Sequence, residues 1–338
     1  MLFREDIEKR EIEMLDPKAC KSAFSKGRAF DEPKDEVRTE FQRDRDRIIH
    51  SKSFRRLMHK TQVFLAPEGD HFRTRLTHTL EVSQIARTIA RALNYNEDLT
   101  EAIALGHDLG HTPFGHNGEE VLNKIHPGGF KHNVQSLRVV DVLEGSHHRV
   151  GSGMNLTMEV RDGIVHHTGS KNPFTLEGQI VHLADRIAYI NHDIDDALRS
   201  GVIRFEDLPD SSIELFGASH RSRINSLVID VIKNSEGKEK ICQSPAFKSE
   251  MDNLRKFMFT NVYKNVRVKR DEDLDKVETV IKSLYEYYLE NPNLLPGELK
   301  EISEKDGVAE AVKDYIAGMT DRFALSTYTD IFVPKGWK

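Results

Sequence analysis

The segment LTEAIALGHDLGHTPFGHNGE, residues 99–119, is the most informative part of this sequence. Its first half has the apolar spacing of a helix. At the end of that helix lie two adjacent polar residues, the imidazole of His107 and the carboxylate of Asp108. Burying both costs roughly several kcal/mol unless each has a partner, such as a metal ion or a salt bridge. A loop punctuated by glycine and proline then presents His111 and His116. The segment therefore predicts a helical framework that ends at a polar site.

Helical spacing also dominates the remainder of the chain. In 79–93 and 177–198, apolar residues recur along one stripe, whereas the alternation typical of strands is scarce. The sequence predicts an all-α fold with an elaborated C-terminal helical part and at most a short β-hairpin, near 150–158. Helices are expected at 79–93, 99–109, 116–126, 133–144, 177–198, 222–234, 247–264, 273–290 and 308–320.

We expect one mostly helical domain, because no repeat or low-complexity linker divides the chain. Residues 1–37 form a charged N-terminal arm that is either mobile or paired with another subunit. Residues 38–200 form the core, and residues 201–338 form a C-terminal helical part packed on that core within the same domain.

The composition is that of an ordinary soluble protein, with 338 residues, 38% hydrophobic, 31% charged and a net charge of −6. No segment approaches the ~18 apolar residues needed to cross a bilayer, and the highly charged start is unlike a secretory signal. Cys20 and Cys242 form no CxxC pair, which favours reduced thiols and a cytoplasmic location.

Arginines are concentrated early in the chain. Such a cluster forms either a solvated helix face or a pocket for phosphate, since the guanidinium fork matches phosphate oxygens. The mild overall acidity argues against a surface that grips nucleic acid everywhere. The residues concerned are Arg38, Arg43, Arg45, Arg47, Arg55, Arg56, Arg73 and Arg75.

Two further metal-ligand candidates lie on other predicted helices. His78 and Asp185 each lie on the side of an amphipathic helix that should face inward. Asp185, Tyr189 and Asp193 are spaced at i, i+4 and i+8, so they share one helix face and resemble a pocket wall. Imidazoles and carboxylates without a thiolate favour one divalent ion of intermediate hardness: Mn, Fe, Ni, Co or Zn, with Mg also compatible.

These motifs resemble those of the HD-domain deoxynucleoside triphosphate triphosphohydrolases, in particular the bacterial dGTPase-like proteins. The similarity rests on the string 107–119, on RTRLTH at 73–78, on SFRRLMHKTQVF at 53–64 and on DYIAGMTD at 314–321. It spans about residues 38–325. The resemblance implies an HD-domain helical fold with an HD phosphohydrolase core. It also implies that His78, His107, Asp108 and Asp185 are the metal ligands.

The resemblance further implies attack of water on the α-phosphorus of a dNTP, which releases the deoxynucleoside and intact triphosphate. The 5′-alkoxide is a poor leaving group that needs a proton. His116 matches the general acid, and Glu119, three residues later, would orient its ring. His111 is expected to assist catalysis, because His111 and His132 match positions that hold phosphate oxygens.

Further positions match the substrate-binding residues of the family. Arg75 and Arg186 match phosphate contacts. Gln62, Tyr189 and Asp193 match the sugar end, where an amide and a carboxylate bind the 3′-hydroxyl and aromatic bulk disfavours ribose. Arg255 and Tyr263 either complete this set or are ordinary helix residues.

The predicted substrate is a dNTP, with dGTP the commonest preference among relatives. The resemblance also suggests a homo-oligomer (tetramer or hexamer), a dNTP effector and contact with single-stranded DNA, but no membrane partner. The alternatives are another HD-domain nucleotide phosphohydrolase, such as a nucleotidase or phosphodiesterase, and a nucleotide-sensing or single-stranded nucleic-acid-binding regulator. The intact pair of His116 and Glu119 favours an enzyme, because a pure sensor would not need it.

Overall fold

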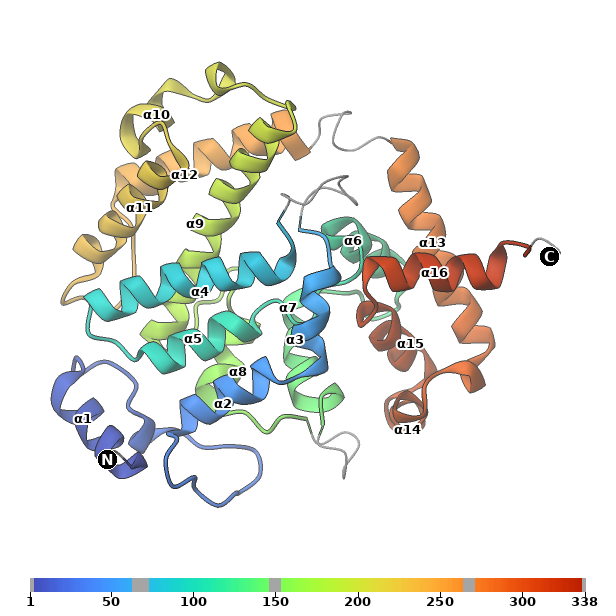
Figure 1. Ribbon diagram of the computed structural model, residues 1–338, viewed down its shortest axis with the longest axis horizontal. Helices are drawn as coiled ribbons and strands as arrows, with labels where there is room; N and C mark the ends of the chain where they lie inside the picture. The colour runs from blue at the N-terminus through green and yellow to red at the C-terminus, as the bar shows by residue number, and fades with distance from the viewer. Residues whose placement is uncertain (1–2, 63–72, 146–152, 264–270, 336–338) are drawn as a thin grey trace. The chain divides into compact units, whose positions relative to one another are not determined.

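The computed structural model describes residues 3–62, 73–145, 153–263 and 271–335 (Figure 1). Within these residues the regular elements are helices, and no strand is present beyond one isolated bridge between Thr61 and Thr74. The predicted all-α class is therefore confirmed. The hairpin considered near 150–158 falls partly outside the described residues, and 153–157 contain no strand.

The chain forms two compact units. Unit 1 comprises Met1–Ile49, Thr77–His107 and Asn155–Lys269, and unit 2 comprises His50–Leu76, Asp108–Met154 and Arg270–Lys338. The expected N-terminal arm, residues 1–37, contains helix α1, Arg4–Met14, and belongs to unit 1. One of the points at which the chain passes from unit 1 to unit 2 is the peptide bond between His107 and Asp108.

Helix α5, Glu97–Gly106, is the central helix of unit 1. It packs against three neighbours, α2, α8 and α9. Its residues from Leu99 to Gly106 are buried except Glu101, so apolar burial holds it in place. A Cβ atom on Gly106 would lie 2.7 Å from Cδ1 of Ile164, so glycine is needed for this close approach. The helices of unit 1 are α1, α2 (Glu40–Ile49), α4 (Arg75–Ala92, from Thr77 onward), α5, α8 (Met158–Val165), α9 (Leu176–Arg199), α10 (Asp210–Phe216), α11 (His220–Ser235) and α12 (Pro245–Met258).

Unit 2 has its own hydrophobic core. Helix α13, Asp271–Glu290, packs against α6, α15 and α16 (Figure 1). Leu122, Ile281, Leu284 and Ile316 are fully buried where these helices meet. The helices of unit 2 are α3 (Lys52–Arg56), α6 (Gly115–Ile125), α7 (His132–Arg138), α13, α14 (Gly297–Asp306), α15 (Val308–Ala317) and α16 (Asp321–Phe332).

Each segment predicted as helical contains a helix. Two of them end differently from the prediction, because 133–144 and 247–264 finish in π-helical turns at Val139–Leu143 and Phe259–Tyr263. A hydrophobic pattern does not distinguish such turns from an α-helix, since the difference lies in which carbonyl each N–H reaches. The sequence did not predict α1, α2, α3, α8, α10, α14 and α16, most of which are short or strongly charged.

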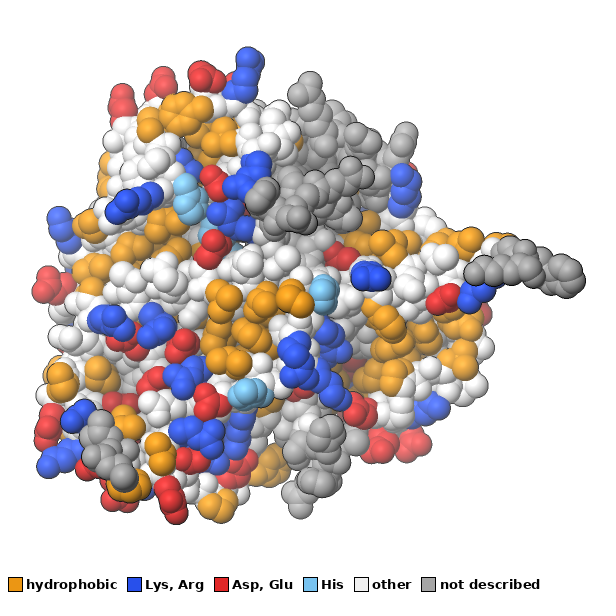
Figure 2. Space-filling view, in the orientation of Figure 1, with side chains coloured by type: hydrophobic (Ala, Val, Ile, Leu, Met, Phe, Trp, Pro, Cys, Tyr) orange, Lys and Arg blue, Asp and Glu red, His pale blue; other side chains and the backbone are white. Residues whose placement is uncertain are grey.

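The early arginines do not form one phosphate pocket. Arg38, Arg43, Arg45 and Arg47 each pair with carboxylates of unit 1. Basic and acidic side chains are correspondingly interspersed on the face in Figure 2. Arg43, Arg45 and Arg47 lie on α2 and Arg38 just before it, so these four residues form ion pairs along a helix face rather than a phosphate pocket. None of the described helices is long and apolar enough to cross a membrane.

Candidate metal centre and its surroundings

Three of the predicted metal ligands meet inside unit 1. His78 lies on α4, His107 follows α5, and Asp185 lies on α9. Nε2 of His78 is 3.2 Å from Oδ1 of Asp185, and Nε2 of His107 is 3.8 Å from the same oxygen. Adjacent ligands of one metal ion lie about 3 Å apart, because metal–nitrogen and metal–oxygen bonds are about 2.1 Å long. The three donor atoms therefore have the spacing of a metal-binding set.

The ring nitrogens of both histidines also suit a metal. Nδ1 of His107 lies 2.6 Å from the carbonyl oxygen of Ala104, which can only accept, so Nδ1 carries the proton and Nε2 keeps its lone pair. Nδ1 of His78 lies 3.2 Å from Nδ1 of His192, which leaves Nε2 of His78 towards Asp185. These residues thus fit a divalent ion at the Nε2 atoms.

The carboxylate of Asp185 is held in its charged form. Burial raises its pKa, but the close contact with the ring of His78 and the nearby ring of His107 outweigh burial and bring the pKa below its ordinary value. An ionised carboxylate is the form that binds a metal.

The fourth predicted ligand, Asp108, belongs to unit 2 and follows His107 directly. Consecutive Cα atoms lie about 3.8 Å apart across a trans peptide, so the chain itself keeps the two residues together. Within unit 2, Oδ2 of Asp108 accepts a hydrogen bond of 2.7 Å from Nη1 of Arg75. Its other oxygen lies 3.5 Å from Nε2 of His111.

Unit 2 contributes a group of three histidines around one carboxylate. The rings of His111 and His132 stack with centroids 4.2 Å apart, and the His116 ring lies 5.4 Å from that of His111. Glu119 lies 2.9 Å from Nδ1 of His132 and 3.4 Å from Nδ1 of His116. Donor atoms of Asp108, His111 and His132 also lie within 4.8 Å of one another, a spacing that could hold a metal ion.

These groups have opposite protonation tendencies. Burial, and then the charge of Arg75, lower the pKa of His111 well below its ordinary value. Burial also disfavours the charged form of His132, but the hydrogen bond and charge of Glu119 raise its pKa overall. Burial would raise the pKa of Glu119, yet its bonds to His116 and His132 bring it far below the usual range. A neutral ring therefore stacks on a ring that favours its cationic form.

The loop between His111 and His116 has an unusual backbone. Phe114 has φ +62° and Gly115 has φ +59°, both in the left-handed region, which is uncommon for a residue such as phenylalanine. The backbone N–H of Phe114 donates to Oδ1 of Asp321 at 2.9 Å, and that of Thr61 donates to Oδ2 at 3.0 Å. One carboxylate at the start of α16 therefore holds both this loop and the segment that carries Gln62.

Arg75, Gln62 and His111 have buried atoms with no partner within the described part of the chain. These atoms are Nε and Nη2 of Arg75, Oε1 of Gln62 and Nδ1 of His111. A Cβ atom on Gly115 would lie 3.2 Å from the backbone oxygen of Gln62 and 3.4 Å from Nη2 of Arg75, so glycine leaves room beside both. Buried polar atoms without partners are costly, which points to a ligand that satisfies them.

The predicted sugar-end residues of unit 1 also lie together. Tyr263 donates a hydrogen bond to Oδ2 of Asp193, and its ring stacks on Tyr189 with centroids 5.9 Å apart. Asp193 is fully buried. Arg186 and Arg255 are exposed. Partial loss of water around its guanidinium, and then repulsion from Arg255, lower the pKa of Arg186, so the two guanidinium groups lie close enough to repel each other.

His167 packs edge-on against His107, with centroids 4.9 Å apart. Sequence reasoning gave no role to two other residues around the site, Lys60 and Asp321. Lys60 donates hydrogen bonds to the carbonyl oxygens of His111 and, at 2.8 Å, of Ala317. Lys60 and Asp321 lie inside the motifs 53–64 and 314–321, but only a structure shows which backbone atoms they bind.

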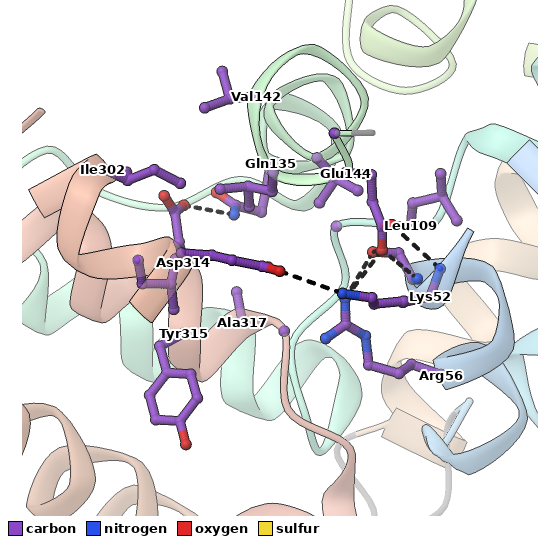
Figure 3. A pocket seen from close by; sticks show the side chains of 18 of the residues that line it. Lys52, Arg56, Leu109, Gln135, Val142, Glu144, Ile302, Asp314, Tyr315 and Ala317 are labelled. Carbon is purple, nitrogen blue, oxygen red and sulfur yellow. Dashed lines mark hydrogen bonds and ion pairs between the residues drawn. The ribbon is translucent and has the colours of Figure 1, made fainter. Parts of the chain in front are cut away.

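Unit 2 also encloses a cavity of about 320 Å³, shown in Figure 3. Four of its charged groups are paired, because Arg56 pairs with Glu144 at 3.3 Å and Lys52 with Glu298 at 3.5 Å. Asp314, which lines the same cavity, accepts a hydrogen bond of 2.8 Å from Gln135. These paired charges among the lining residues give the cavity no preference for a charged ligand.

Comparison with known proteins agrees with this architecture. Residues 75–190 match the HD domain, and residues 241–330 match the phosphohydrolase-associated domain. A deoxyguanosinetriphosphate triphosphohydrolase-like protein of Caldanaerobacter subterraneus subsp. tengcongensis is 57% identical over 337 residues, which is 100% of this chain and 98% of that protein. Proteins of the same name from Clostridium tetani and Clostridium perfringens are 48% and 49% identical, with 99% of this chain covered and 97% and 99% of theirs.

The helical fold, the His/Asp groups and the two domain matches define an HD-domain phosphohydrolase. Within that class, the chain belongs to the family of deoxyguanosinetriphosphate triphosphohydrolase-like proteins. The resemblance noted from the sequence motifs is thereby confirmed.

Proposed function

We propose that this protein is a metal-dependent dNTP triphosphohydrolase and that dGTP is the first substrate to test. The observation that carries the proposal is the convergence of His78, His107 and Asp185, with both Nε2 atoms facing the same carboxylate oxygen. The names of its relatives support the choice of a nucleoside triphosphate and of dGTP.

The proposed metal ligands are His78, His107, Asp108 and Asp185. One divalent ion, Mn, Mg, Fe, Ni, Co or Zn, would supply a Lewis acid and activate water when bound. Imidazole Nε2 atoms beside ionised carboxylates support an ion of intermediate hardness.

Phosphate oxygens are proposed to bind the buried cationic and imidazole groups of unit 2. Arg75 offers Nε and Nη2, which have no partner among the described residues, and His111 offers Nδ1. His132, whose pKa is raised by Glu119, adds a ring that favours its charged form. Arg186 and Arg255 are proposed to meet the outer phosphates, because both are exposed cations.

The leaving 5′-oxygen needs a proton, and His116 is proposed to donate it. Its side chain is 56% exposed, so the ring can reach a substrate, and Glu119 lies 3.4 Å from its Nδ1. Glu119 would orient His116 while it also holds His132.

The sugar is proposed to lie against Gln62, Tyr189 and Asp193. The unpartnered Oε1 of Gln62 can accept from the 3′-hydroxyl, and the carboxylate of Asp193 is the second polar group. Stacked Tyr189 and Tyr263 provide the aromatic bulk that would disfavour a 2′-hydroxyl. Cytoplasmic location, homo-oligomerisation, a dNTP effector and single-stranded DNA contact remain predictions from the sequence.

Product analysis tests the proposal directly. The metal-free protein is loaded with Mn²⁺ or Mg²⁺ and incubated with each dNTP, singly and mixed. We expect deoxynucleoside and tripolyphosphate in equal amounts. Orthophosphate or pyrophosphate as the first product would instead identify another HD-domain nucleotide phosphohydrolase, and no turnover would favour the regulatory alternative.

A further inference from the structure

His192 links the metal-binding face of unit 1 to a glutamate on α4. Its Nδ1 lies 3.2 Å from Nδ1 of His78, and its Nε2 lies 2.8 Å from Oε2 of Glu81. The side chain of His192 is 1% exposed, whereas that of Glu81 is 40% exposed. A row of four side chains therefore runs towards solvent through two imidazoles: Asp185, His78, His192 and Glu81.

Metal binding decides where the protons in this row lie. A metal ion would bind Nε2 of His78 through its lone pair, so the proton of a neutral His78 ring would lie on Nδ1. Nδ1 of His192, 3.2 Å away, must then act as the acceptor. The proton of a neutral His192 ring is left on Nε2, 2.8 Å from Oε2 of Glu81.

Without this row, the proton of His78 could instead occupy Nε2 and bond to Asp185, which lies only 3.2 Å away. That tautomer would block the metal-binding nitrogen. His107 has no such need, because the carbonyl oxygen of Ala104 already fixes its tautomer. Both imidazoles therefore carry their proton on Nδ1, which accepts no metal, but the proton is fixed by Ala104 in His107 and by His192 in His78.

We propose that His192, held by Glu81, is a positioning residue that fixes the tautomer and ring orientation of His78 for metal binding. This inference rests on the proposed function, since it presumes that His78 is a ligand. Outer hydrogen-bond partners of metal-bound histidines commonly change metal affinity by about 10–100-fold. His192 itself contributes no metal ligand.

The test is calorimetric titration of Mn²⁺ into metal-free full-length protein. We expect His192→Ala to raise the Kd for Mn²⁺ by about 10–100-fold. His192→Gln should recover part of the loss, because its amide can accept from His78 and donate to Glu81. The matched control is His182→Ala, another buried histidine of α9, whose Nδ1 bonds to the carbonyl oxygen of His166 at 3.0 Å. It should leave the Kd within twofold.

A structural role alone would lower the melting temperature of the metal-free protein without a selective effect on Kd. Glu81→Ala serves if His192→Ala does not fold, because Glu81 is partly exposed. It should raise the Kd severalfold. If folded His192→Ala keeps the wild-type Kd for Mn²⁺, this inference is overturned and the proposed function is not. If His192→Ala does not fold, a wild-type Kd in Glu81→Ala has the same consequence. A wild-type protein that binds no Mn²⁺ would overturn the proposed function as well.

Discussion

Glu119 holds His132 by two hydrogen bonds, one from ring Nδ1 and one from backbone N–H, each 2.9 Å long. Its contact with His116 is longer, at 3.4 Å. The sequence spacing suggested that Glu119 serves His116, and the structure adds His132 as its closer partner. Glu119 therefore connects the proposed proton donor with the proposed phosphate site.

Glu119→Gln should impair both histidines. The amide keeps the size of the side chain but removes the charge that raises the pKa of His132. We expect kcat for dGTP hydrolysis to fall by on the order of 10²-fold, at the lower end for loss of acid–base assistance. Glu120→Gln is the matched control, because the neighbouring Glu120 is exposed and pairs with Lys124 at 2.9 Å. Equal kcat values for the two variants would remove Glu119 from the site.

His116→Ala should separate binding from chemistry. The metal ligands and Arg75 remain, so the variant should keep the wild-type Kd for Mn²⁺ and still bind dGTP. Turnover should fall by on the order of 10²–10⁴-fold for loss of the general acid. Single-turnover kinetics with saturating enzyme measure this step. A loss of only a few-fold would place the proton donor elsewhere.

His107→Ala and Asp185→Ala should each abolish metal binding and activity together. Each variant removes one of the donors that converge in unit 1. Metal content after dialysis and hydrolysis of dGTP are the two measurements. A variant that is active without bound metal would contradict the ligand assignment.

Asp321→Ala should destabilise unit 2. The carboxylate accepts from the backbone of Phe114 and of Thr61, and Phe114 has a left-handed backbone that needs support. Losing hydrogen bonds to a charged group costs about 2 kcal/mol in the free energy of unfolding. Urea denaturation measures it. Asp330→Ala, on the same helix and paired, among the described residues, with exposed Lys335 at 2.9 Å, should change stability by less than about 0.5 kcal/mol.

The buried ammonium of Lys60 predicts a pH dependence. Burial, and then repulsion from Arg56, lower its pKa to about 7. The unfolded chain, with a lysine pKa of about 10.4, holds more protons than the folded chain between these values. The contribution of Lys60 to the free energy of unfolding therefore rises with pH across that window, by at most about 1.4 kcal/mol per pH unit. Below pH 7 the cost of burying the charged ammonium is fully present.

Lys60→Met isolates this contribution. Urea denaturation at pH 7 and pH 9 gives the free energy of unfolding of both proteins. From pH 7 to pH 9, the free energy of unfolding of the wild type should increase relative to that of the variant. A pH-independent difference would show that Lys60 keeps an ordinary pKa in the folded protein.

The sequence alone was sufficient for the all-α class and the family. Both follow from local information, namely helical spacing in segments such as 177–198 and the unusual density of histidine in 107–119. It also singled out His78, His107 and Asp185, because a charged or imidazole group on the inward face of an amphipathic helix needs a buried partner.

Only the tertiary structure decided which atoms meet. Glu81 and His192 lie on helices more than a hundred positions apart, and neither stands in a motif that predicts their contact with each other or that of His192 with His78. Asp321 binds the backbone of Phe114, and Lys60 binds the carbonyl oxygen of His111; backbone atoms carry no side-chain signature in the sequence. The physical reason is the same in each case: hydrogen-bond partners are selected by proximity in space, which packing creates and which sequence spacing does not encode.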